Sequence, residues 1–199
     1  MNNEAFISLI WPLGKASNLI RNLTLVFFGS LILILSAKIE VGWPIPMTMQ
    51  TFVVYLLSIT YGWKLASSTF LLYLLQGLKW PVFAFGGGVS YFITSPTVGF
   101  LYGMLAATLV IGILAEKDFN SSKPSIIPFV SIFRTLLPII LGAFIIFFFG
   151  LTYMSFSMGW EKSIQLGLKP FILSESIKII LAAILMPYAW KVVKYIKNK

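Results

Sequence analysis

Long apolar stretches alternate with short polar breaks along almost the whole chain. The stretches cover residues 24–37, 51–61, 65–78, 97–115, 126–150 and 171–187. A helix needs about 20 residues to cross a bilayer, and a shorter apolar run crosses when its helix starts earlier or tilts. The pattern therefore predicts an all-α membrane protein with six transmembrane helices.

The flanks of these stretches predict the domain organisation. Residues 1–23 hold a short apolar piece with no small-residue cleavage site after it, which predicts a cytoplasmic or interfacial lead-in rather than a signal peptide. We expect one transmembrane domain over residues 24–193, and a basic cytoplasmic tail over residues 194–199. No internal repeat separates the chain further.

Composition excludes an ordinary soluble protein. Hydrophobic residues make up 58% of the chain and charged residues only 11%, whereas soluble domains average about 25% charged. The mean hydropathy is +0.92. Too few charges are present to cover a water-facing surface, so the bilayer is the expected surrounding.

The net charge of +9 is informative through the positions of the positive residues along the chain. In so apolar a chain, this charge favours loops that face the cytoplasm, and we expect no nucleic-acid partner. Most of the lysines and arginines outside the spans fall on the side that would hold both termini. The positive-inside rule then predicts the cytoplasmic (inner) membrane, both termini in the cytoplasm, and an outward position for residues 41–50, 79–96 and 153–169.

Several kinds of chemistry are missing from the sequence. The chain has no cysteine and no histidine, and its six acidic residues are scattered, so we expect no metal, no cofactor and no enzymatic activity. The P-loop pattern is also absent, so ATP would have to be hydrolysed by a partner.

Two of the outward segments could contact a ligand. In residues 41–50, two prolines stiffen an arm that ends in Thr48 and Gln50, although a rigid loop with an aromatic anchor explains the same pattern. In residues 79–96, three consecutive glycines lie among aromatic side chains, which suits a flat ligand but equally a flexible hairpin tip. The candidate contacts there are Trp80, Phe83, Phe85, Gly86, Gly87 and Tyr91.

Glu175 and Lys178 form the sharpest feature, because they lie three residues apart, on one helical face, inside the last apolar stretch. Ionisable groups in a span normally face a wet cavity or the interior of the bundle. The alternative is a structural ion pair with the lysine reaching toward the membrane surface. Arg134 is better explained by contact with lipid phosphates, and a contact with a cytoplasmic partner stays open.

Four motifs together resemble a known family. They are Pro44-Ile45-Pro46-Met47-Thr48-Met49-Gln50-Thr51, residues 73–84 with Pro81-Val82-Phe83-Ala84, Ser95-Pro96-Thr97 with Gly99-Phe100, and Pro170-Phe171 through Lys178. Over most of its length the chain resembles the BioY proteins, the biotin-specific substrate-binding S-components of energy-coupling factor (ECF) transporters.

The resemblance implies a six-helix S-component bundle with an outward-facing pocket for the fused ureido ring of biotin. In that family an Asp and a Lys three residues later contact the ligand, and they match Glu175 and Lys178 here. It also implies an ECF transmembrane subunit and ATPase subunits as partners. The family's Gly-Asp is replaced by Ser174-Glu175, so an S-component for another heterocyclic vitamin stays open, as does, more remotely, a membrane-embedded enzyme.

Overall fold

The computed structural model describes residues 15–42, 45–117 and 128–197. The helices are α2 (Lys15–Lys38), α3 (Gln50–Gly77), α4 (Val89–Thr94), α5 (Val98–Lys117), α6 (Pro128–Met158), α7 (Trp160–Gly167) and α8 (Phe171–Lys197). A 3₁₀ turn, η1 (Ala84–Gly86), precedes α4, and a two-stranded antiparallel hairpin pairs β1 (Glu40–Val41) with β2 (Met47–Thr48). The expected all-helical architecture is present.

The second and third apolar stretches are two arms of α3, joined without a loop. The break falls at Gly62, whose φ of 74° is open to glycine but strained for other residues. The N–H of Trp63, which starts the second arm, donates to the Glu116 carboxylate at 3.2 Å. A single glycine and a carboxylate cap from α5 therefore replace the expected connecting loop.

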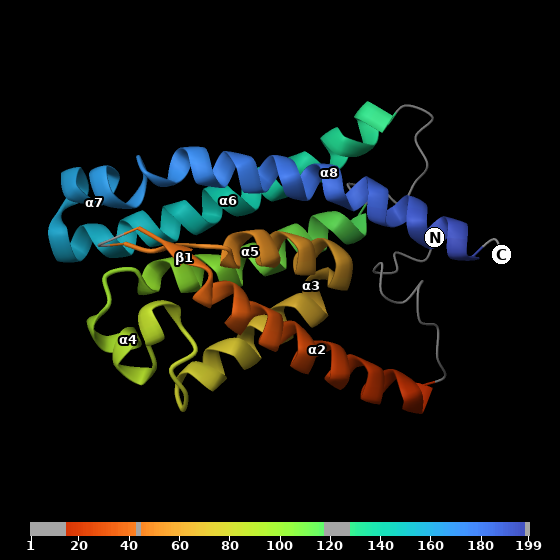
Figure 1. Cartoon of the computed structure of the whole chain (residues 1–199), viewed down its shortest axis with the longest axis horizontal. Helices are drawn as coiled ribbons and strands as arrows, with labels where there is room; N and C mark the ends of the chain where they lie inside the picture. The colour runs from red at the N-terminus through yellow and green to blue at the C-terminus, as the bar shows by residue number, and fades with distance from the viewer. Residues whose placement is uncertain (1–14, 43–44, 118–127, 198–199) are drawn as a thin grey trace.

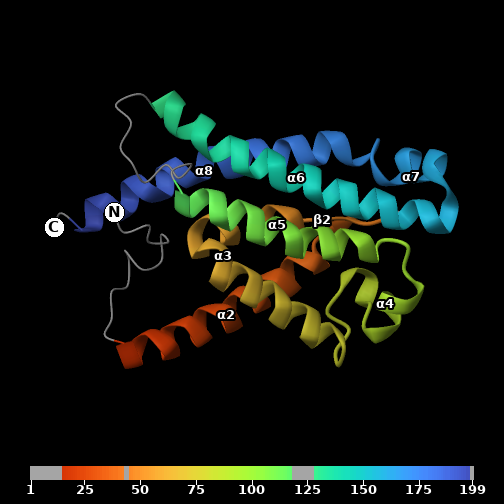
Figure 2. The same ribbon diagram turned by 180° about the vertical axis from the view of Figure 1, so that it is seen from behind.

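The two ends of the bundle differ in what they carry (Figures 1 and 2). α2 begins and α8 ends at one end, while the β hairpin, α4 and α7 gather at the other. Residues 41–50, 79–96 and 153–169, predicted to share one side, therefore contribute to the same end, apart from Trp43 and Pro44, which lie outside the described residues.

The helices extend beyond the apolar stretches. α2 begins at Lys15, so residues 15–23 of the expected lead-in are helical. α8 continues through Pro187 to Lys197, so the helix reaches into the expected tail, and the domain edges stay a prediction. Hydropathy marks only the part of a helix that suits lipid, whereas backbone hydrogen bonding continues into polar flanks.

Burial is typical of a membrane protein. The core is rich in aromatic side chains such as Tyr55, Phe70 and Tyr73, all fully buried. Large apolar side chains also cover the outside, for example Phe144 and Leu173, which are 68% and 73% exposed. Among the described residues, three helical segments are long and apolar enough to span a membrane: Asn18–Lys38, Val98–Lys117 and Arg134–Met158.

Candidate functional site

The first turns of α8 present one polar face to the bundle interior. Phe171, Glu175 and Lys178 follow one another at intervals of four and three residues, so they project from the same side of the helix. Glu175 is only 4% exposed and Lys178 only 5% exposed. Lys178 therefore does not reach out to the membrane surface, and both charges are buried inside the protein.

Both buried charges have hydrogen-bond partners within the protein. Lys178 Nζ donates to the backbone oxygen of Thr48 at 2.7 Å, to Thr51 Oγ1 at 3.1 Å and to Glu175 Oε2 at 3.2 Å. The Glu175 carboxylate also accepts hydrogen bonds from the Thr51 hydroxyl at 3.0 Å and the Tyr55 hydroxyl at 2.6 Å. Charge-assisted bonds of this kind offset the cost of burying both ions.

The hairpin brings Thr48 and Gln50 to the same place. Thr48 pairs with Glu40 across the hairpin, and Gln50 is the first residue of α3. The Gln50 amide donates to the Tyr73 hydroxyl at 2.7 Å, and its oxygen accepts from the Thr48 hydroxyl at 3.2 Å. These bonds fix the orientation of the amide beside the charged pair.

A second polar group, here called the hydroxyl cluster, consists of Tyr91, Ser95 and Thr97. The hydroxyls of Tyr91 and Thr97 are hydrogen bonded to each other, and Ser95 Oγ lies 2.7 Å from Thr97 Oγ1. Tyr91 comes from α4, and Thr97 immediately precedes α5. The cluster joins these two elements at the end of the bundle that carries the hairpin.

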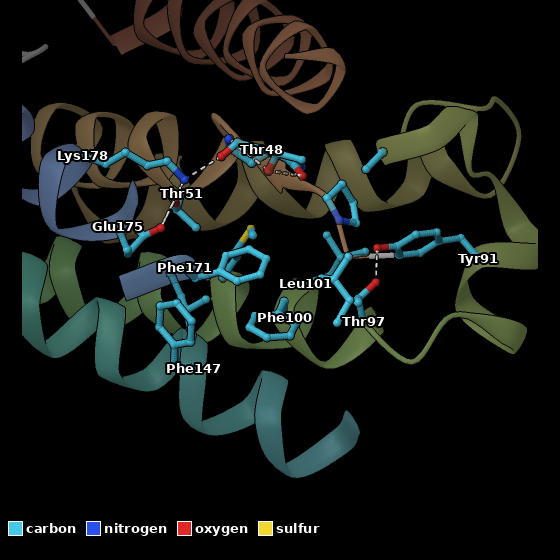
Figure 3. A pocket seen from close by; sticks show the side chains of 16 residues that line it. Thr48, Thr51, Tyr91, Thr97, Phe100, Leu101, Phe147, Phe171, Glu175 and Lys178 are labelled. Carbon is cyan, nitrogen blue, oxygen red and sulfur yellow. Dashed lines mark hydrogen bonds and ion pairs between the residues drawn. The ribbon is translucent and has the colours of Figure 1, made fainter. Parts of the chain in front are cut away.

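Both polar groups line one cavity of about 540 Å³, counting the open space at its mouth. Figure 3 shows Glu175 and Lys178 toward one end, Tyr91 and Thr97 toward the other, and aromatic rings between them. The lining residues are Ile45, Pro46, Thr48, Gln50, Thr51, Ala84, Tyr91, Thr97, Phe100, Leu101, Met104, Ile146, Phe147, Phe171, Glu175 and Lys178.

Half of the sequence-predicted contacts line this cavity: Thr48, Gln50, Tyr91, Glu175 and Lys178. The rest of the expected set, Trp80, Phe83, Phe85, Gly86 and Gly87, is not among the lining residues, and their contact with a ligand stays a prediction. The aromatic side chains along this segment differ in burial. Trp80 and Phe85 turn outward, 53% and 54% exposed, while Phe83 is buried against Tyr73 and Tyr91 behind the cavity wall.

The glycines of this segment form a turn rather than an opening for a ligand. Gly86 has a φ of 69°, a conformation that favours glycine, with open space around it. Gly87 packs directly against the Tyr91 side chain, so a Cβ at this position would collide with it. Of residues 79–88, only Ala84 reaches the cavity.

Two side chains from α2 and β1 hold the same segment in place. Lys38, at the end of α2, donates from Nζ to the backbone oxygens of Pro81 at 2.8 Å and Phe83 at 2.7 Å. Glu40, in β1, accepts the N–H of Phe85 at 2.8 Å. Phe85 itself has a φ of 52°, the left-handed region that most side chains avoid. We call Lys38 and Glu40 the loop clamp.

Sequence reasoning missed several cavity residues. Thr51 and Tyr55 hold Glu175, and their spacing of four residues on an apolar helix is a signal that could have found them. Phe100, Phe147 and Phe171 form an aromatic wall, with Phe100 and Phe171 stacked at 6.3 Å. Phe100 and Phe171 belong to the motifs that carry the family resemblance, whereas nothing local distinguishes Phe147 from the other phenylalanines of α6.

Metal ligands are not gathered at this site or elsewhere in the described ranges, where no group of three or more acidic, histidine or cysteine side chains is close enough to share an ion. The Glu175 carboxylate is occupied by a lysine and two hydroxyls. The cavity is thus equipped to bind an organic molecule through hydrogen bonds and apolar contact.

Comparison with known proteins identifies relatives of the whole chain. A sequence model described as the BioY family matches residues 7–195. The "Biotin transporter BioY" of Thermotoga maritima is 32% identical over 146 residues, which cover 71% of this chain and 79% of that protein. The protein of the same name from Rhizobium etli is 31% identical and covers 71% of this chain and 76% of its own length.

A solved structure shares the fold. It is described as the S-component for biotin from an ECF-type ABC transporter, and it superimposes with a TM-score of 0.76 over 90% of this chain and 95% of the other. The sequence identity between the two is 22%, so this likeness speaks for the fold alone.

Proposed function

Because the chain belongs to the BioY family, we propose that it is a biotin-binding S-component, a transport subunit rather than an enzyme, that takes up biotin with an ATP-driven ECF module. The observation that carries the proposal is the buried pair of Glu175 and Lys178 at the wall of a ligand-sized cavity. Biotin is uncharged at its fused urea ring, which carries two N–H donors and one carbonyl acceptor.

The charged pair and Gln50 supply the complementary groups for this ring. The Glu175 carboxylate accepts a urea N–H. All three hydrogens of Lys178 already have acceptors, so the lysine holds the carboxylate in place. The Gln50 amide has two hydrogens and gives one of them to Tyr73, so the other is available for the urea oxygen.

The aromatic wall provides the remaining affinity. Phe100, Phe147 and Phe171 line the cavity next to the polar groups and would cover the apolar sulfur-containing ring and the side chain of biotin. Burial of apolar surface contributes about 25 cal/mol per Å² removed from water. The ligand leaves chemically unchanged, since transport needs no covalent step.

The membrane arrangement that supports transport places six helical segments across the bilayer: α2, the two arms of α3, α5, α6 and α8. α2 starts and α8 ends on the cytoplasmic side of the inner membrane under this proposal, and the cavity then opens outward. Lys64 and Lys117 support this orientation, because they lie at the arm junction of α3 and at the end of α5, the cytoplasmic side in this arrangement.

The energy source must come from partners, because the chain has no P-loop for ATP. The proposed partners are an ECF transmembrane subunit and its ATPase subunits. Uptake of biotin by cells that carry the chain together with such a module, and its loss when the ATPases are inactivated, is the expected behaviour.

Equilibrium binding of labelled biotin to the purified chain in lipid nanodiscs tests the function and the site together. We expect Glu175→Ala and Lys178→Ala each to weaken binding by at least about tenfold, because each leaves a buried partner without its counter-charge. Lys162→Ala, on the exposed surface of α7, is the matched control. Wild-type protein that does not bind biotin would refute the function, and unaffected Glu175 and Lys178 variants would refute the site.

A second candidate ligand class rests on the Ser174-Glu175 departure from the Gly-Asp of the family. The extra methylene of glutamate moves the carboxylate by about a bond length, which favours a different heterocyclic vitamin. Competition against labelled biotin by a panel of unlabelled vitamins distinguishes the two. If unlabelled biotin displaces labelled biotin at a lower concentration than any other vitamin of the panel, the biotin assignment is supported.

A further inference from the structure

We infer that Tyr55 is a positioning residue for ligand binding, which acts through Glu175 without touching the ligand, and that its hydroxyl is matched to the length of the glutamate side chain. The inference rests on the proposed function. It adds a residue outside the cavity that sets the affinity for the ligand, and a reason why the site depends on the longer acidic side chain at position 175.

Tyr55 lies behind the wall of the cavity. Its side chain is fully buried in the core, and the residues that line the cavity do not include it. It belongs to α3, one helical turn after Thr51, so both hydroxyls come from the same side of that helix. An effect of this tyrosine on binding therefore has to pass through a residue that does line the cavity.

Glu175 is that residue. The Tyr55 hydroxyl donates to Glu175 Oε1 at 2.6 Å, which is the shortest hydrogen bond of the carboxylate within the described residues. A hydroxyl that donates to a carboxylate typically does so at such a short distance, and these bonds are stronger than bonds between neutral groups. In the described part of the chain, Tyr55 has no other hydrogen-bond partner, so its hydroxyl serves Glu175 alone.

The two oxygens of the carboxylate are used unequally. Oε2 accepts from the Thr51 hydroxyl at 3.0 Å and from Lys178 Nζ at 3.2 Å, whereas Oε1 accepts only from Tyr55 among the described residues. Each carboxylate oxygen has two acceptor positions. Oε1 is therefore the atom with a position left for a ligand N–H, and Tyr55 is the group that fixes where this atom lies.

Bonds to Oε2 alone would leave the carboxylate free to turn. The last torsion of a glutamate side chain has no sharp staggered minima, so it is fixed only when both oxygens are held. Thr51 and Lys178 hold one oxygen, and Tyr55 holds the other. Without the Tyr55 hydroxyl, Oε1 would occupy a range of positions, and the ligand would have to order it on binding.

The tyrosine also sets which acidic side chain suits position 175. Aspartate is shorter than glutamate by one carbon–carbon bond, about 1.5 Å, so its carboxylate would be drawn away from a hydroxyl that now lies at 2.6 Å. The Tyr55 ring is packed in the core and cannot follow. Its hydroxyl would then be a buried donor without an acceptor, which is costly.

The test is a double-mutant cycle, measured by equilibrium binding of labelled biotin to the full chain in nanodiscs. We expect Tyr55→Phe to weaken binding about tenfold and Glu175→Asp to weaken it at least about tenfold. The variant with both substitutions should bind no more weakly than Glu175→Asp alone, because phenylalanine removes the stranded hydroxyl. Independent effects would instead multiply to about hundredfold.

Tyr61→Phe is the matched control, because it removes the hydroxyl of another tyrosine on the same helix arm, which bonds to the backbone oxygen of Leu25 at 3.3 Å. We expect it to change binding by less than about twofold, alone or combined with Glu175→Asp. Thermal melting of each variant separates folding from binding. The double variant also guards against a folding defect caused by the stranded hydroxyl in Glu175→Asp.

A Tyr55→Phe protein that binds biotin as tightly as the wild type, whether or not it melts earlier, gives the tyrosine a structural role only and overturns the inference. A double variant weakened by the product of the two single effects also overturns it, since Tyr55 would then act independently of Glu175. Both results leave the proposed function standing, because wild-type protein binds biotin in them. Wild-type protein that does not bind biotin overturns the inference and the function together.

Discussion

The charged end of the cavity and the glycine-rich segment 79–88 both carry residues that the sequence predicts to be ligand contacts. These residues are buried at the charged end, whereas two of the aromatic residues in segment 79–88 are exposed. Glu175 and Lys178 are buried and held by partners from the hairpin, α3 and α8. Trp80 and Phe85 point outward from a turn. Ionisable groups inside a bundle must find partners, whereas exposed aromatic side chains are free to face lipid or water.

The difference teaches how each region contributes to binding. The charged end is preorganised, because every hydrogen of Lys178 has an acceptor before any ligand arrives. Segment 79–88 supplies only Ala84 to the cavity, and the loop clamp of Lys38 and Glu40 holds it. We therefore expect the first region to set which ligand binds and the second to set how fast a bound ligand leaves.

Removing both charges together should separate ligand recognition from folding, with the largest expected effect. We expect Glu175→Leu with Lys178→Met to weaken biotin binding by at least about hundredfold, while melting no earlier than either single substitution, because a lone buried charge costs more than none. Binding in nanodiscs and thermal melting measure the two effects. A double variant that melts well below both single variants would contradict this account.

Loosening the loop clamp should change the rate at which biotin dissociates more than the rate at which it associates. Lys38→Met removes two hydrogen bonds from a charged donor to the backbone of segment 79–88. We expect bound biotin to dissociate about tenfold faster with little change in the association rate. Lys79→Met is the control, since this exposed lysine of the same segment contacts only the Trp80 ring. An unchanged dissociation rate would show that the clamp does not hold the ligand in.

Stiffening the turn should have a smaller effect. Gly86→Ala places a Cβ at a φ of 69°, which costs about 1–2 kcal/mol although the surrounding space is open. If the closed segment is needed for tight binding, we expect the affinity for biotin to fall by about fivefold. Titration with labelled biotin measures this loss. Affinity equal to that of the wild type would mean that the turn is not coupled to the cavity.

Truncating the exposed aromatic side chains should have the smallest effect. Trp80→Ala and Phe85→Ala each remove a ring that does not line the cavity, so we expect less than about a twofold change in the affinity for biotin. The same titration serves as the measurement. A tenfold or greater loss of affinity would indicate that these residues contact the ligand and that the segment rearranges on binding.

The sequence predicted part of the site for identifiable reasons. Glu175 and Lys178 are conspicuous because charges are rare in apolar helices, and the Pro-x-Pro motif indicates the arm that carries Thr48 and Gln50. The five missed residues that hold Glu175 or build the aromatic wall are apolar or hydroxyl-bearing side chains in apolar helices. Their role depends on which face of each helix is turned toward the cavity.

The sequence alone determined that this chain is an all-helical membrane protein with two opposite charges on one helical face, because hydropathy and the cost of charge in lipid act on local stretches of residues. Tertiary structure decided the rest. It broke α3 at Gly62, turned Phe85 outward and Phe83 inward, and placed the hydroxyl cluster at the far end of the cavity from Glu175. These outcomes depend on packing and hydrogen bonding between segments distant in the chain, which no local pattern encodes.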